Sequence, residues 1–150
     1  MNFQEHTQPD KLERYSFLWS EIRLLIAAVA LFLGGYPPLL YIFRISSLYG
    51  IENLLLKLCW IISGVASGYL LYRWFTGNKM LFGGKANLDT AAFFVSIVSG
   101  INLGITGLLG TNIGLSISSN KLILVIFGLL YLASAYHLSK RWKASGKKLF

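Results

Sequence analysis

Four long runs of apolar residues, almost free of charge, constrain this chain more than any other feature of its sequence. A helix that crosses a bilayer needs roughly 20 mostly apolar residues, because each adds about 1.5 Å towards a hydrocarbon core of about 30 Å. Such runs cover about residues 24–43, 54–72, 91–109 and 122–138. We therefore predict an all-α polytopic membrane protein, with four transmembrane helices in a single integral membrane domain over residues 1–150.

Two other folds fit these runs less well. A soluble four-helix bundle needs a polar face on each helix, recurring at helical spacing, and none of the four runs carries one. A membrane β-barrel alternates apolar and polar residues over segments of about ten, whereas these runs are continuous. Only 13% of the residues are charged, against about a quarter in a soluble domain, so the composition also favours membrane helices.

The basic residues predict which side of the membrane each connecting segment faces. They translocate poorly and therefore accumulate in cytoplasmic segments. Here they concentrate in the two tails and between the second and third runs, whereas the other connections carry only Arg44, Lys57 and Lys121. We expect both termini in the cytoplasm, as an even number of spans requires. We expect that the net charge of +8 marks this topology. The alternative is that the last tail binds anionic lipid headgroups, and we expect no nucleic acid partner.

The two halves of the chain resemble each other. Residues 66–69 (ASGY) align with residues 133–136 (ASAY), 67 positions later, and basic and aromatic residues follow both stretches. Parallel repeats of this kind occur in membrane proteins. We therefore predict that the first two and the last two helices form two related helical hairpins.

The third run carries the most specific pattern, residues 100–110 (GINLGITGLLG). Residues 91–138 resemble a family of short bacterial two-helix membrane proteins of unknown function, whose first helix ends in a similar Gly-x-x-Asn-x-Gly-x-x-Gly run. Gly128 and Tyr131 would match a Gly and a Tyr of the family's second helix, while Leu103 replaces a Trp. The resemblance implies membrane architecture and no activity, and with the simple topology it suggests a bacterial inner membrane.

Small residues on the second and third runs are the first candidate site residues. They are Gly64, Gly68, Gly100, Gly104 and Gly107, and they recur at helical spacing. In lipid, close backbone approach through small residues is what favours helix association. We predict that these glycines pack helices against each other. The alternative is that they clear space for a narrow pore.

Asn102 and Thr106 are polar candidates within the third run. An unpaired amide inside the membrane costs several kcal/mol, so Asn102 must face another helix, a backbone carbonyl or water. We predict a hydrogen bond between helices. The alternative is a cavity lined by Asn102 and Thr106 with Ser96 and Ser99.

Pro37 and Pro38 fall inside the first run, after two glycines. Because proline has no amide hydrogen, carbonyls one turn earlier lose their partners and a helix bends there. We predict a kink in the first helix. The alternative is a broken helix that builds a substrate site, as in some transporters.

We predict no enzymatic activity, catalytic residue, metal site or cofactor. No ionisable side chain lies near the centre of a predicted helix. Asp89 precedes the third run and is expected to cap its helix. A single cysteine, Cys59, excludes an internal disulfide and makes a Cys/His metal cluster implausible.

For the function, two hypotheses follow. The first is an intramembrane interaction or assembly protein, whose partners are membrane lipid and other membrane subunits or a second copy of the chain. The alternative is a subunit of an oligomeric channel or transporter for a small solute or ion. The sequence alone gives neither the partner nor the solute.

Overall fold

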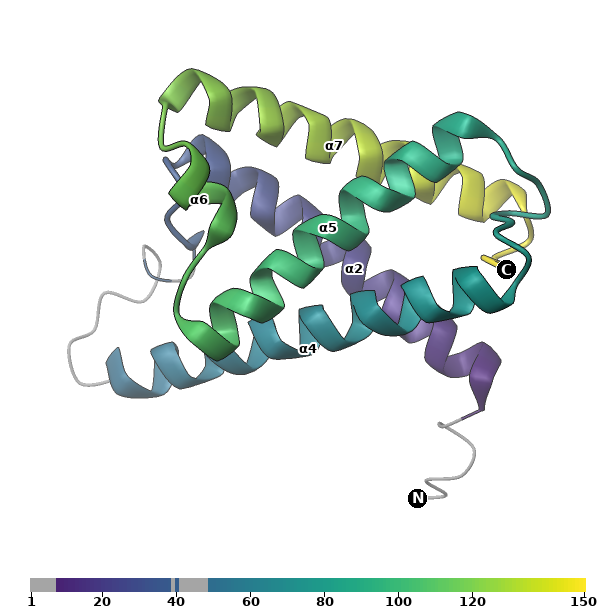
Figure 1. The fold of residues 1–150 in the computed structure, drawn as a ribbon, viewed down its shortest axis with the longest axis horizontal. Coiled ribbons are helices and arrows are strands. Elements are labelled where there is room, and N and C mark those ends of the chain that lie inside the picture. Colours follow the sequence, from purple (N-terminus) through teal and green to yellow (C-terminus); the bar gives the residue numbers. More distant parts are fainter. Residues whose placement is uncertain (1–7, 39, 41–48) are drawn as a thin grey trace.

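The computed structural model describes residues 8–38, 40 and 49–150. Within them the chain forms four long helices, α2 (Pro9–Phe32), α4 (Tyr49–Thr76), α5 (Asn87–Leu109) and α7 (Lys121–Ala144), and one short helix, α6 (Ile113–Ile117) (Figure 1). Each long helix is long and apolar enough to cross a membrane. The predicted all-α fold with four membrane helices is confirmed, and the protein is a multi-pass integral membrane protein.

The first helix begins much earlier than the sequence analysis placed it. The prediction of residues 24–43 was wrong, because α2 covers Pro9–Phe32. Pro9 suits the first turn of a helix, where its missing N–H would have no partner in any case. Asp10 adds a negative charge next to the positive end of the helix dipole. The helix therefore includes residues 9–23, the fifteen residues that precede the predicted span.

α2 also ends earlier than predicted. Gly34 and Gly35 follow it with φ angles of +80° and +90°, a conformation that favours glycine and stops the helix. Pro37 and Pro38 lie beyond this end, so the predicted kink within the first helix was wrong. The last part of the predicted span, residues 39 and 41–43, lies outside the described residues.

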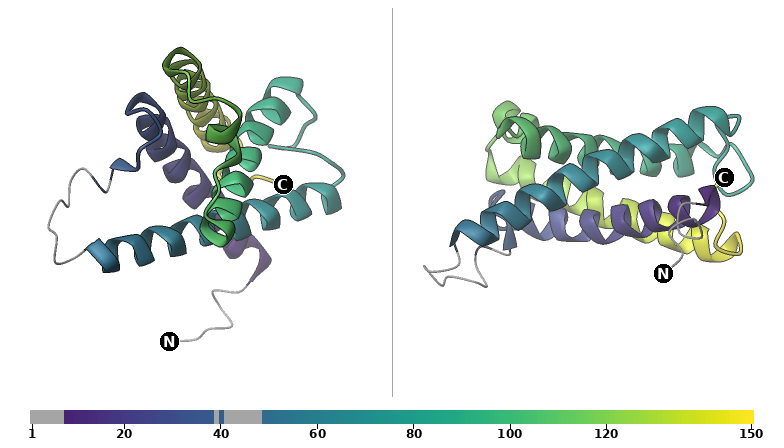
Figure 2. Two further views of the ribbon diagram at one scale, coloured as in Figure 1. Left: turned by 60° about the vertical axis from the view of Figure 1, so that its left-hand side comes forward. Right: turned by 90° about the horizontal axis from the view of Figure 1, so that it is seen from below.

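The four long helices pair in an order that differs from the chain order. α4 packs most extensively on α5, and α2 on α7. Seen from below, α2 and α7 lie together on one side of α4 and α5 (Figure 2, right). Each closest pair therefore joins one helix of each half of the chain. The two predicted hairpins are not the main packing units, and a duplication stays a prediction.

The largest apolar cluster of the described residues lies at one end of the bundle, where α2 and α5 begin and α4 and α7 end; we call it the closed end. It contains Phe17, Leu70, Trp74, Leu81, Phe82, Ala92, Phe93, Ile97, Leu138, Trp142 and Leu149. The ring of Trp74 meets Phe94 edge to face, with centroids 5.1 Å apart. The N–H of Phe82 donates to the carbonyl of Leu149 at 2.7 Å. The loop after α4 and the last residues of the chain thus cover this end.

Candidate functional site

Polar side chains are buried along the described bundle. They are Glu13, Ser16, Ser20, Glu21 and Arg23 of α2, Glu52, Ser63 and Ser67 of α4, Asp89, Ser96, Ser99 and Thr106 of α5, and Ser134 of α7. Lipid tails neither accept nor donate hydrogen bonds, so such groups need partners inside the protein. The partners differ between the closed end and the middle of the bundle.

Asp89 pairs with two cationic side chains at the closed end. Its carboxylate is 1% exposed, and its Oδ2 lies 3.0 Å from Arg141 Nε while its Oδ1 lies 2.7 Å from His137 Nε2. His137 and Arg141 are four residues apart on α7, so one face of that helix presents both. The expected capping role of Asp89 was wrong, because the cap residue is Ala86 and no side chain caps α5.

Glu13 forms the second ion pair of the closed end. Arg73 of α4 donates to Glu13 Oε2 from Nη2 at 2.9 Å and from Nε at 3.2 Å. The backbone N–H of Phe150 donates to the other oxygen, Oε1, at 3.3 Å. Both oxygens of this carboxylate therefore have partners, and they tie the start of α2 to the end of α4 and to the last residue.

Arg23 is buried near the middle of the bundle and has neutral partners. Its Nη1 donates to Ser99 Oγ at 2.9 Å, and its Nη2 donates to the carbonyl of Ser96 at 2.8 Å and to Ser96 Oγ at 3.2 Å. Ser96 and Ser99 lie on either side of the midpoint of α5. Nε of Arg23 is buried and has no partner within the described part of the chain. The guanidinium thus keeps an unpaired N–H and no carboxylate among its contacts.

Glu21 lies two residues before Arg23 and faces another helix. Its Oε2 accepts a hydrogen bond from Ser139 Oγ of α7 at 2.9 Å, and its Oε1 is buried without a partner among the described residues. Residues two apart on a helix do not face each other, so this carboxylate forms no hydrogen bond with Arg23, although the two opposite charges attract each other. The expectation that no ionisable group lies near the centre of a membrane helix was therefore wrong, because Glu21 and Arg23 lie near the middle of α2.

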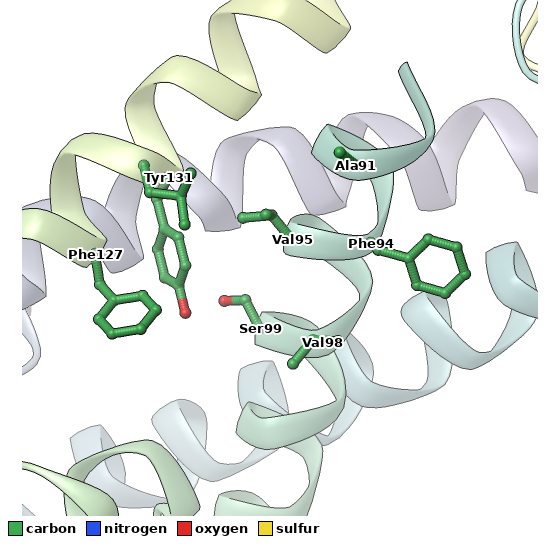
Figure 3. A pocket seen from close by; sticks show the side chains of 8 residues that line it. Ala91, Phe94, Val95, Val98, Ser99, Phe127 and Tyr131 are labelled. Carbon is green, nitrogen blue, oxygen red and sulfur yellow. The ribbon is translucent and has the colours of Figure 1, made fainter. Parts of the chain in front are cut away.

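A pocket of about 290 Å³ opens between α5 and α7, next to these groups. Most of its lining is apolar, including Phe94, Val95 and Val98 of α5 and Phe127 of α7 (Figure 3). Two hydroxyl groups, those of Ser99 and Tyr131, point towards each other within it. Ser99 Oγ also accepts the Arg23 hydrogen bond, so the pocket and the buried guanidinium are neighbours. The arrangement offers hydrogen-bond donors and positive charge to a ligand that accepts hydrogen bonds.

The structure places most of the predicted glycines between α4 and α5. A Cβ on Gly104 would lie 2.7 Å from Gly64 Cα, so only hydrogen fits at this crossing. A Cβ on Gly100 would collide with the Ser67 side chain, and one on Gly107 would lie 3.0 Å from the carbonyl oxygen of Lys57. This is the arrangement that helix packing requires. Gly68 differs, since a Cβ there would meet nothing within 4 Å.

Asn102 and Thr106 serve the end of α5 rather than the pocket. Asn102 Nδ2 donates to Asn112 Oδ1 at 2.9 Å, and its Oδ1 accepts from the N–H of Ile113 at 3.0 Å. Thr106 Oγ1 donates to the carbonyl of Asn102 at 2.8 Å. The side chain of Asn102 thus holds the segment that contains α6. The expected hydrogen bond between helices is therefore present, but it joins α5 to the short helix α6.

Sequence analysis missed Arg23 and Glu21 because it began the first helix one residue after Arg23. The pair Pro9-Asp10 was the available signal, since proline followed by an acidic residue is typical of a helix start. A helix begun there would have carried Ser16, Ser20 and Arg23 inward at helical spacing. The hydrogen-bond partners of Arg23, Ser96 and Ser99 on α5, had already been predicted as possible cavity residues.

The described residues contain no group of three or more His, Cys, Asp or Glu side chains placed to hold a metal ion. Cys59 is a free, exposed thiol. The expected absence of a cofactor and of enzymatic activity remains a prediction.

Comparison of the chain with models of protein families, with curated proteins and with solved structures gives no match. The resemblance of residues 91–138 to two-helix bacterial membrane proteins remains a prediction. Any functional conclusion therefore depends on the geometry of the chain itself.

Proposed function

We propose that this protein is a subunit of an oligomeric membrane channel or carrier for a small anionic solute, with Arg23 as its anion-binding residue. The observation that carries this function is the guanidinium of Arg23, 6% exposed near the middle of the bundle, with hydroxyl and carbonyl partners and one unpaired N–H. An ionisable residue within a membrane helix is most often functional, because placing it there is costly.

The cost of a buried cation supports a role in binding. An arginine at the centre of a membrane helix costs about 2.5–3.5 kcal/mol on insertion scales. A structural arginine would offset that cost with a carboxylate, as Arg73 and Arg141 do at the closed end. Among the described residues, the hydrogen-bond partners of Arg23 are all dipolar, and its positive charge is balanced only by the nearby Glu21 carboxylate, which it does not bond. That charge can therefore attract an anion. That attraction is stronger in a medium of low dielectric constant than in water.

The glycine contacts remove the main reason for preferring an assembly protein. The small-residue faces of α4 and α5 favoured association with a second protein, but Gly64 and Gly104 already meet within the same chain. An oligomer of this chain is still part of the proposal, because four helices alone enclose little room for a pathway. The proposed location is a bacterial inner membrane.

Anion flux from liposomes that contain the purified protein tests this function. Vesicles loaded with chloride, acetate or phosphate should release at least one of these anions faster than vesicles without protein. Arg23→Gln should reduce that release about tenfold or more, because a charged hydrogen bond contributes about 1.5–3 kcal/mol. Arg23→Lys, which keeps the charge but not the planar donors, should retain an intermediate rate.

The matched control is Arg14→Gln, which removes an exposed arginine from the same helix and should leave the flux unchanged. Circular dichroism and size-exclusion chromatography would establish that each variant is folded. Equal anion release by wild-type protein and Arg23→Gln would overturn the proposal. A pathway that conducts cations in preference to anions would also overturn it.

A further inference from the structure

The pocket between α5 and α7 opens towards the region that lipid occupies. Of the side chains that line it, Val98 is 62% exposed, Phe127 47% and Leu130 42%. Apolar side chains with that exposure on a membrane helix face hydrocarbon rather than water. A ligand that reaches this pocket therefore enters sideways from the bilayer, and its outer part must be apolar.

The inner part of the same pocket is polar. Ser99 Oγ accepts a hydrogen bond from Arg23 Nη1 at 2.9 Å, which leaves the serine O–H free to donate. The Tyr131 hydroxyl points at Ser99 from α7 and has no hydrogen-bond partner among the described residues (Figure 3). Two O–H donors thus face each other in front of a buried guanidinium.

The chemistry of these groups selects the kind of ligand head. Two donors that face each other match the two oxygens of a carboxylate, and Arg23 behind Ser99 favours negative charge. A cationic head is excluded because no acidic residue lines the pocket. The cavity of about 290 Å³ is close to the lower end of ligand pockets, so it suits one flexible chain rather than a bulky head.

We propose that this pocket binds a long-chain carboxylate, with the carboxylate at Ser99 and Tyr131 and the hydrocarbon chain along Phe94, Val98 and Phe127. The inference rests on the function proposed above because it relies on the same guanidinium, and it extends the anions bound near Arg23 from small solutes to a long-chain carboxylate. It adds a route of entry, from the bilayer between α5 and α7, to the anion-binding role of Arg23.

Photoaffinity labelling of the full chain in liposomes tests this site. The probe is a long-chain fatty acid that carries a diazirine on its alkyl chain, and labelled peptides are mapped by mass spectrometry. Labels should concentrate on residues 91–99 and 127–131. Excess oleate should remove them, whereas an alkyl ammonium ion of equal length should not.

Two variants, each with a matched control, make the test more specific. Tyr131→Phe removes one donor without changing the ring, and it should weaken competition by oleate severalfold, as expected for a hydrogen bond to a charged group. Val98→Trp should fill the pocket and reduce labelling at both segments. The matched controls are Tyr136→Phe, at an exposed position of α7, and Val65→Trp, at an exposed position of α4; both should behave as wild type.

The outcomes separate this inference from the proposed function. Site-specific labelling without anion flux would support the pocket and reject the channel or carrier. Flux of small anions with labels scattered over the lipid-facing surface would support the channel or carrier and reject the pocket. Equal competition by an alkyl ammonium ion or an alkyl phosphate would overturn the carboxylate assignment, and so would unchanged oleate competition in Tyr131→Phe together with unchanged labelling of Val98→Trp.

Discussion

At the closed end of the bundle, both buried carboxylates have cationic partners. Asp89 binds His137 and Arg141, and Glu13 binds Arg73. Near the middle, Arg23 binds hydroxyl and carbonyl groups, and it keeps a buried nitrogen without a partner. The first arrangement is what stability demands of charges at the margin of a membrane. The arrangement around Arg23 leaves a charged N–H without a hydrogen-bond acceptor, and an anionic ligand could supply that acceptor.

The difference is also one of packing. The closed end is filled by aromatic rings and covered by the end of the chain. In the middle, α4 and α5 touch through glycine backbone, while α5 and α7 leave a pocket between them. The same helix, α5, therefore has a close-packed face towards α4 and an open face towards α7. Three variants test this difference between the closed end and the middle of the bundle.

Asp89→Asn should have the largest effect on stability. It leaves Arg141 and His137 without the carboxylate that joins α5 to α7, and breaking a buried pair costs about 3–5 kcal/mol. Because Arg141 is 40% exposed on its side chain and water relieves part of the loss, we expect about 2–3 kcal/mol. Unfolding of the purified protein in mixed micelles with a denaturing detergent measures it. Stability equal to wild type would contradict a structural role for the pairing of Asp89 with Arg141 and His137.

Gly104→Ala should destabilise the protein by about 1–3 kcal/mol, the usual cost of overpacking. Its Cβ would lie 2.7 Å from Gly64 Cα, so the two backbones must move apart. Gly68→Ala is the matched control on the exposed face of α4, where a Cβ meets nothing within 4 Å. That variant should be neutral or gain up to about 1 kcal/mol from helix propensity. The same micelle titration compares the two, and equal losses would contradict close packing at the crossing.

Arg23→Met should change stability least, by about 1 kcal/mol or less and in the stabilising direction. Replacing a buried guanidinium that has no hydrogen-bonded carboxylate with an apolar side chain of similar length removes a desolvation cost, which outweighs the lost attraction to Glu21. Anion flux should fall at the same time. A large loss of stability, comparable to that of Asp89→Asn, would show that Arg23 is a structural residue like those of the closed end.

The sequence alone was enough to predict that the helices lie in a membrane and that the fold is all-α. The bilayer core is about 30 Å thick, so a helix of about 20 apolar residues can cross it. Backbone groups within the core must form hydrogen bonds inside the protein, and a helix meets this requirement. The glycine spacing on the second and third runs also indicated where backbones could approach closely, and Gly64 and Gly104 do meet.

Which buried charges have partners depends on the arrangement of the helices in space. Hydropathy alone placed the start of the first span after Arg23. A hydropathy average gives a charged residue the same penalty whether its side chain faces lipid or protein. The cost of burying Arg23 depends on the residues of α5 that face it. These residues, Ser96 and Ser99, are more than 70 positions away in the chain. The helix order in space brings them together, and pairing of α2 with α7 and α4 with α5 is a property of packing that no local pattern encodes.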